Sequence, residues 1–166
     1  MKKLSKVSLK KKLSVVLAAL TIIMVFIPTA QAKQYGSTVE LSFNPDFSET
    51  EPIWVGTISG EIDGTMKFWA TGPDPTKDLG HPPGFPWQVH FFTEYWEITD
   101  GDGDLIAGID NGNTGYSNWK YRMNGVVTEA TGKYVDLVGH RVHMHGQIEW
   151  TEVFVSGVAV GLVIIN

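Results

Sequence analysis

Residues 87–98 place chemically active groups among aromatic rings on both faces of an expected strand. Because side chains alternate between the faces of a strand, His90 and Glu94 share one face with Phe92 and Trp96. This mixture is typical of the wall of a small-ligand pocket, in which Phe92 and Trp96 would contact the ligand. Desolvation among rings would raise the pKa of Glu94, which would act as a general acid or base and share its proton with His90.

A structural interpretation of the same segment stays open. One face would fill the core, and the other would pack beneath residues 71–86, which hold five prolines and three glycines in sixteen positions. This proline-rich segment is expected to be a long ordered loop, either a lid over a binding site or a stiff connector.

The acidic turn that follows places three carboxylates at alternate positions, Asp100, Asp102 and Asp104, with glycines between them. Ca²⁺ collects oxygen ligands from such turns. However, an EF-hand loop needs Gly at its sixth position and Glu at its twelfth, and here these are Leu105 and Asn111. A polar hairpin turn is therefore the alternative to a calcium site.

Two histidines, His143 and His145, share one face of an expected strand over 141–150. Such a pair can chelate zinc, but a zinc site needs further ligands whose proximity the spacing does not supply. The same face carries Arg141, Gln147 and Glu149. Exposed polar surface on a half-buried antiparallel strand is therefore favoured over a zinc site.

Several other kinds of site are missing from the sequence. It has no cysteine, no Gly-x-Ser-x-Gly motif and no glycine-rich phosphate loop ahead of a helix. Hydrolase and nucleotide-binding motifs are thus absent, whereas an isomerase or cyclase stays open.

The elements that must position these residues are strands, because period-two alternation recurs and helical spacing does not. Eight strands are expected, over residues 36–43, 53–59, 64–70, 87–98, 104–110, 119–129, 141–150 and 153–165. Asn111-Gly112 is expected to be a turn and Asn124-Gly125 a bulge. The prediction is an all-β fold with a single eight-stranded antiparallel barrel, with a β-sandwich as the alternative.

The first 32 residues have the pattern of a signal peptide. Six lysines precede an apolar run over 13–27, and Ala30-Gln31-Ala32 offers small residues for cleavage. We therefore expect a signal peptide over 1–32 and a mature barrel domain over 33–166, secreted or held in the cell envelope. An uncleaved membrane anchor is the alternative.

The charge of the mature domain limits its partners. Seven basic and eighteen acidic residues follow Ala32, which gives a formal net charge of −11. A field of this sign repels phosphate backbones and anionic membranes, so nucleic acid and, after cleavage, membranes are not expected partners. The absence of cysteine means that the core alone must stabilise the domain.

The spacing Gly132-x-Tyr134-x-x-Leu137-x-Gly139, with an early hairpin over Gly56–Gly60 and 66–68, resembles small barrels of the allene oxide cyclase and dirigent family. The resemblance implies an eight-stranded barrel with an apolar cavity, often dimeric or trimeric, that steers or isomerises a reactive hydrophobic compound. No active-site residue of that family is carried over.

Three functions follow from these observations. The first is a secreted barrel that binds a small apolar or aromatic molecule and needs no cofactor. The second is an isomerase or cyclase that uses Glu94 and His90 within the same barrel. The third is an extracellular structural or adhesion module whose Asp100, Asp102 and Asp104 bind Ca²⁺.

Overall fold

The computed structural model describes residues 33–46, 48, 50–70 and 89–166. The compact unit to which they belong is Lys33–Asn166. The predicted signal peptide over 1–32 and the predicted loop over 71–86 lie outside the described residues.

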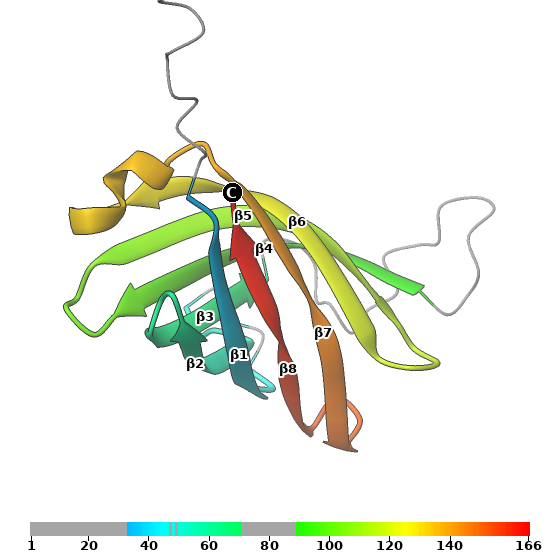
Figure 1. Ribbon diagram of the computed structural model, residues 1–166. Coiled ribbons are helices and arrows are strands. Elements are labelled where there is room, and N and C mark those ends of the chain that lie inside the picture. The colour runs from blue at the N-terminus through cyan, green and yellow to red at the C-terminus, as the bar shows by residue number, and fades with distance from the viewer. Residues whose placement is uncertain (1–32, 47, 49, 71–88) are drawn as a thin grey trace, which may run out of the picture. The chain divides into compact units, whose positions relative to one another are not determined.

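The described chain forms eight strands that pair in sequence order (Figure 1). They are β1 (Tyr35–Phe43), β2 (Trp54–Gly60), β3 (Gly64–Ala70), β4 (Val89–Asp100), β5 (Leu105–Gly115), β6 (Lys120–Ala130), β7 (Arg141–Glu152) and β8 (Ser156–Ile165). All neighbours are antiparallel, and β1 also pairs with β8, so the sheet closes. The predicted eight-stranded antiparallel barrel is confirmed, and the β-sandwich alternative is wrong. Closure leaves no unpaired strand edge.

Alternation along each strand separates the interior of the barrel from its outer face. In β7, Val142, Met144 and Ile148 are buried, whereas Arg141 and His145 are exposed. The predicted half-buried character of this strand is confirmed, and polar residues lie outside because only the inner face is dry.

The path of β5 differs from the prediction at Asn111-Gly112, where no turn occurs. The strand continues to Gly115, and Gly112 lies opposite Phe92, whose ring fills the space that a side chain at 112 would need. Glycine is therefore required here for close approach rather than for a turn. The predicted bulge at Asn124-Gly125 is also wrong, because the register shifts between Ala107 and Gly108.

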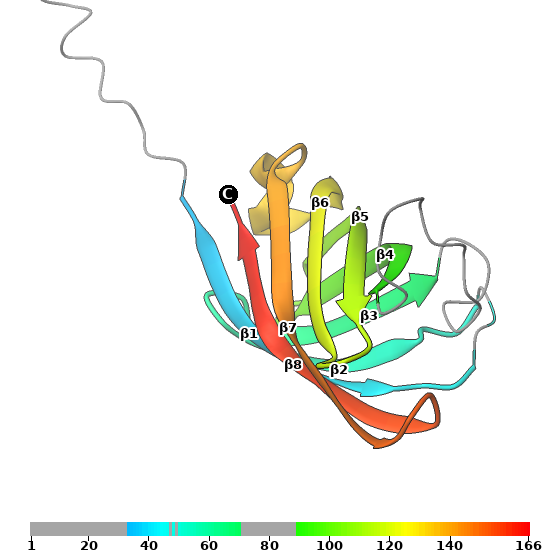
Figure 2. The same ribbon diagram turned by 90° about the vertical axis from the view of Figure 1, so that its right-hand side faces the viewer.

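The strand connections gather at two ends of the barrel. At one end, which we call the helix end, a 3-10 helix η1 (Gly132–Leu137) joins β6 to β7 and buries Tyr134 and Leu137. Figures 1 and 2 both show η1 at the end where the chain terminates. At the opposite end, which we call the aromatic end, lie the connections over 44–53, 116–119 and 153–155.

The four residues of the Gly-x-Tyr-x-x-Leu-x-Gly spacing all serve η1. Gly132 and Gly139 have φ of 51° and 88°, values that favour glycine. Tyr134 and Leu137 join the hydrophobic core. The spacing therefore builds a plug that closes the helix end. No described helix has the length and apolarity needed to cross a membrane.

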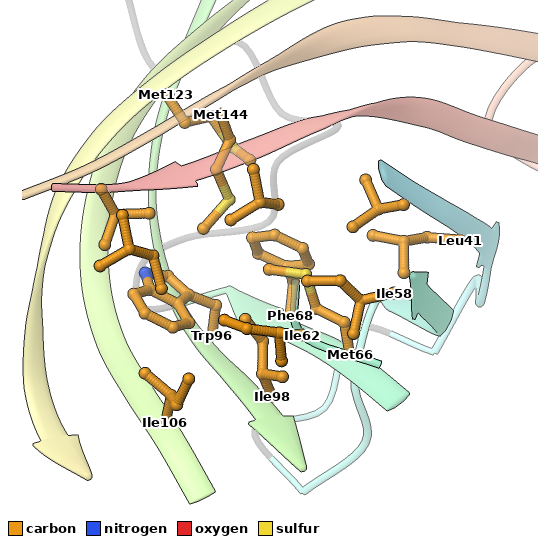
Figure 3. Packing of buried hydrophobic residues seen from close by; sticks show 14 of the residues in the cluster. Leu41, Ile58, Ile62, Met66, Phe68, Trp96, Ile98, Ile106, Met123 and Met144 are labelled. Atoms are coloured by element: carbon orange, nitrogen blue, oxygen red, sulfur yellow. The ribbon is translucent and has the colours of Figure 1, made fainter. Parts of the chain in front are cut away.

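The core lies mainly in the half of the barrel near the helix end. Trp96 is fully buried and lies among Ile62, Ile98 and Ile106, as Figure 3 shows. Its ring covers Gly108 on the neighbouring strand, where an added side chain would collide with it. This pairing of an aromatic ring with a cross-strand glycine fixes how β4 packs on β5.

Candidate functional site

The interior is hollow toward the aromatic end, with a cavity of about 80 Å³. All eight strands contribute to its wall, in which the polar groups of the described residues are Glu94, Thr114, the hydroxyls of two tyrosines and the indole N–H groups of three tryptophans. The lining residues are Val39, Leu41, Phe43, Ile53, Trp54, Phe68, Phe92, Glu94, Thr114, Tyr116, Trp119, Tyr121, Met123, Met144, Ile148, Trp150, Phe154 and Ala159. An apolar wall with few polar groups is the usual composition of a small-molecule site.

Six aromatic rings, which we call the aromatic cluster, surround the cavity at the aromatic end: Phe43, Trp54, Tyr116, Trp119, Trp150 and Phe154. Each contacts at least two others, with ring centroids 4.9 to 6.3 Å apart and mostly edge-to-face. Trp150 contacts four of the others. All six are only partly buried, so the cluster presents ring surface at this end.

Two rings of the aromatic cluster stand on strained backbone. Trp119 and Phe154 have φ of 53° and 60°, in the left-handed region that costs a residue with a side chain about 1 to 2 kcal/mol. Each lies in the connection between two strands, and each lines the cavity. Backbone strain of this kind is concentrated at sites where a side chain must take one position.

Among the described residues that line the cavity, Glu94 is the one acidic residue. Its neighbour on the next strand is also acidic. Glu94 on β4 lies opposite Asp110 on β5, and their side chains are 5% and 1% exposed. Burial, and then the nearby charge of Asp110, raise the pKa of Glu94 well above its usual value. Burial raises the pKa of Asp110 to about 7. The pair therefore holds protons near neutral pH and can give or accept them.

Tyr121 on β6 completes the polar part of the wall. Burial and the charge of Glu94 raise its pKa to about 12, so its hydroxyl stays protonated. The hydroxyl lies over Gly146 and Gly161, which face each other on β7 and β8 and leave room for it. Without side chains at these two positions, a bulky phenol fits across the barrel.

The sequence-predicted ligand contacts and acid–base residues have different positions. Phe92 and Glu94 line the cavity, whereas Trp96 lies in the core beyond it. The backbone of His90 pairs with Thr114. It lies four residues from Glu94, or about 13 Å along an extended strand, and the side chain of His90 is outside the described part.

The carboxylates of the acidic turn interact with Lys133, at the start of η1. The Asp100 carboxylate accepts hydrogen bonds from the backbone N–H of Asp102 and Asp104, each 2.9 Å long. Lys133 Nζ lies 2.6 Å from Asp100 and 2.8 Å from Asp102. Asp104 accepts a bond from the Lys133 backbone N–H. The three predicted calcium ligands thus bind the start of η1 in this structure.

The two histidines of the predicted zinc pair lie on the outer face of β7. His143 Nδ1 is 2.7 Å from Asn124 Oδ1, and His145 is exposed opposite Arg122. Within the described ranges, no group of three or more His, Cys, Asp or Glu side chains is arranged to hold a metal ion.

Sequence reasoning missed Asp110, Thr114, Tyr121 and the aromatic cluster. Thr114 was hidden by the predicted turn at Asn111-Gly112, which ended the strand too early. Asp110 was the last residue of the predicted strand over 104–110, and extending the alternation of Ile106, Gly108 and Asp110 would have placed Thr114 on the same inner face. The aromatic cluster has no local signal, because its members come from five separate parts of the chain.

Comparison of the chain with protein-family models, with curated proteins and with solved structures finds no match. The resemblance to the allene oxide cyclase and dirigent family therefore stays a prediction, and function must be argued from the site.

Proposed function

We propose that this protein is an exported barrel that binds a small, mainly apolar molecule in the cavity at its aromatic end. The observation that carries the proposal is the wall itself, in which the described residues supply rings and aliphatic groups from all eight strands and a single carboxylate, Glu94. The left-handed backbone of Trp119 and Phe154 supports it, because both residues line the cavity and strain of this kind is concentrated at functional sites.

The size of the cavity limits the ligand. A volume of about 80 Å³ is far below the roughly 300 to 1,000 Å³ typical of sites for drug-sized molecules. The occupant is therefore a compact molecule with one ring or a short chain, or the corresponding end of a longer molecule that extends past the aromatic cluster.

Binding of a panel of small aromatic and aliphatic probes, followed by calorimetry and tryptophan fluorescence, tests the proposal. Trp150→Ala removes the ring with the most contacts in the aromatic cluster, so affinity should fall at least tenfold. The matched control is Trp69→Ala, because Trp69 packs on Tyr95 outside the cavity lining and its loss should change affinity less than twofold. Failure of every probe to bind, or equal effects of the two variants, would contradict the proposal.

A second function, isomerisation or cyclisation of the bound molecule, is favoured by one observation. Glu94 lines the cavity and has a raised pKa, as a general acid or base at neutral pH requires. The test is turnover of a bound hydrophobic compound, which Glu94→Gln should abolish while the variant still binds it. Unchanged turnover in Glu94→Gln would remove this candidate.

A further inference from the structure

The Glu94–Asp110 pair is buried with no cation beside it among the described residues. Both carboxylates are more than nine-tenths buried, and neither forms an ion pair with a described Lys, Arg or His. Both oxygens of Asp110 lack a hydrogen-bond partner among the described residues. Buried carboxyl groups are normally hydrogen-bonded or paired with a cation, so this pair is incomplete as it stands.

The surroundings of the pair suit an organic cation better than a metal ion. Glu94 is the one carboxylate among the described residues that line the cavity, where the other side-chain oxygens are the hydroxyls of Thr114 and two tyrosines. Ca²⁺ takes six to eight oxygens, more than this wall supplies. An ammonium group needs only two or three acceptors, and an apolar body attached to it would fit the remaining wall.

The aromatic cluster adds a second, independent attraction of the same sign. The faces of tryptophan, tyrosine and phenylalanine rings carry negative potential, and sites for ammonium compounds are commonly lined by several such rings. Six of these rings surround the end of the cavity, and three of them belong to tryptophan, the strongest cation binder. The charge of −11 on residues 33–166 also attracts cations to the domain.

We propose that the ligand is an amine, with its ammonium group against Glu94, behind which the buried Asp110 lies, and its compact apolar body among the rings of the aromatic cluster. The inference rests on the proposed function, because it names the class of molecule that the cavity binds. The ammonium N–H groups donate to the Glu94 carboxylate. The charge of the ammonium group then supplies the cation that no described residue provides.

Matched probes of two sizes separate this inference from the proposed function. Butylamine is compared with butanol and benzylamine with benzyl alcohol, by calorimetry at pH 7.5 on the chain over 33–166, the compact unit that holds the site. At least one amine should bind ten or more times more tightly than its alcohol. Benzoate, which has the opposite charge, should bind most weakly.

The variant Glu94→Gln keeps the shape of the side chain but can no longer ionise against an ammonium group, so the preference for amine over alcohol should fall at least fivefold. The control is Glu97→Gln, on the same strand but outside the cavity lining, which should keep the preference. Asp110→Asn serves as a second variant if Glu94→Gln does not fold, and it too should reduce the preference.

The outcomes are distinct. Alcohols that bind as tightly as the amines would overturn the amine inference and leave the binding function in place. An amine preference that survives in both Glu94→Gln and Asp110→Asn would also overturn it. If neither amines nor alcohols bind at either size, the binding function itself fails.

Discussion

Two aspartates on neighbouring strands, Asp100 and Asp110, are both buried but behave in opposite ways. At the helix end, Lys133 and backbone N–H groups hold the pKa of Asp100 at about 2. In the barrel interior, Asp110 has no hydrogen-bond partner among the described residues, and burial raises its pKa to about 7. A carboxyl group at the helix end is thus paired with a cation, whereas one in the barrel interior is not.

The two aspartates have opposite effects on stability as pH changes. Asp110 has a raised pKa, so its contribution is fully present below pH 3.8 and is lost as the pH rises to about 7. Asp100 has a lowered pKa, so its contribution is present above pH 3.8 and is lost as the pH falls to about 2. From these two groups alone, stability should be greatest near pH 4.

The largest expected effect comes from removing the plug at the helix end. Tyr134 is 5% exposed and its ring contacts Tyr35, so Tyr134→Ala should lower the free energy of unfolding by about 3 kcal/mol. Urea unfolding measures the loss. The control, Val135→Ala in the same 3-10 helix, alters a 54% exposed side chain and should cost less than about 0.5 kcal/mol. Probe binding at the aromatic end should survive in both variants; loss of binding in Tyr134→Ala alone would show that the two ends are not separable.

The next largest effect should be a gain in stability from Asp110→Asn. A rise from 3.8 to about 7 corresponds to about 4 kcal/mol of destabilisation once Asp110 is ionised, since one pKa unit equals about 1.4 kcal/mol. The buried, unpaired amide of asparagine itself costs about 1 to 3 kcal/mol, which offsets part of this gain in stability. Unfolding at pH 8 should therefore need on the order of 2 kcal/mol more free energy, with no gain at pH 4.

The matched control for this variant is Asp136→Asn, at an exposed position on η1, which should change stability by less than about 0.5 kcal/mol at either pH. An equal effect of Asp110→Asn at pH 4 and pH 8 would mean that Asp110 does not titrate between them.

The fold could be predicted from the sequence because the burial that specifies it is local and periodic. The alternation in β7, with Val142, Met144 and Ile148 inside, is readable from ten residues. Strand prediction from alternation failed in β5 because an inward-facing glycine interrupts the pattern. Gly112 resembles a turn residue unless it is known that the ring of Phe92 covers it. Such cross-strand pairs depend on register, which the sequence of one strand does not state.

The site could be predicted only in part, for a related reason. Glu94 and Phe92 were found because they share a face of one strand. Asp110 was missed because its importance arises from lying opposite Glu94, and that pairing depends on the length of β5. The lysine that neutralises the acidic turn was also missed, because Lys133 lies 31 residues from Asp102 and reaches it only through the position of η1.

The smallest expected effect is that of Asp100→Asn. The asparagine oxygen can still accept the two backbone bonds from Asp102 and Asp104, so the turn should keep its shape, whereas the ion pair with Lys133 is lost and the hydrogen bond with Tyr134 is weakened. The fall in stability between pH 4 and pH 2 should then become shallower, since the group that takes up a proton in this range is gone.

Asp102→Asn is the control, because that side chain is 78% exposed and its charge is screened by solvent. Urea midpoints measured from pH 2 to pH 5 distinguish the two variants. A profile for Asp100→Asn that parallels the unchanged protein would show that acid destabilises the barrel elsewhere, and the contrast between the two aspartates would then rest on Asp110 alone.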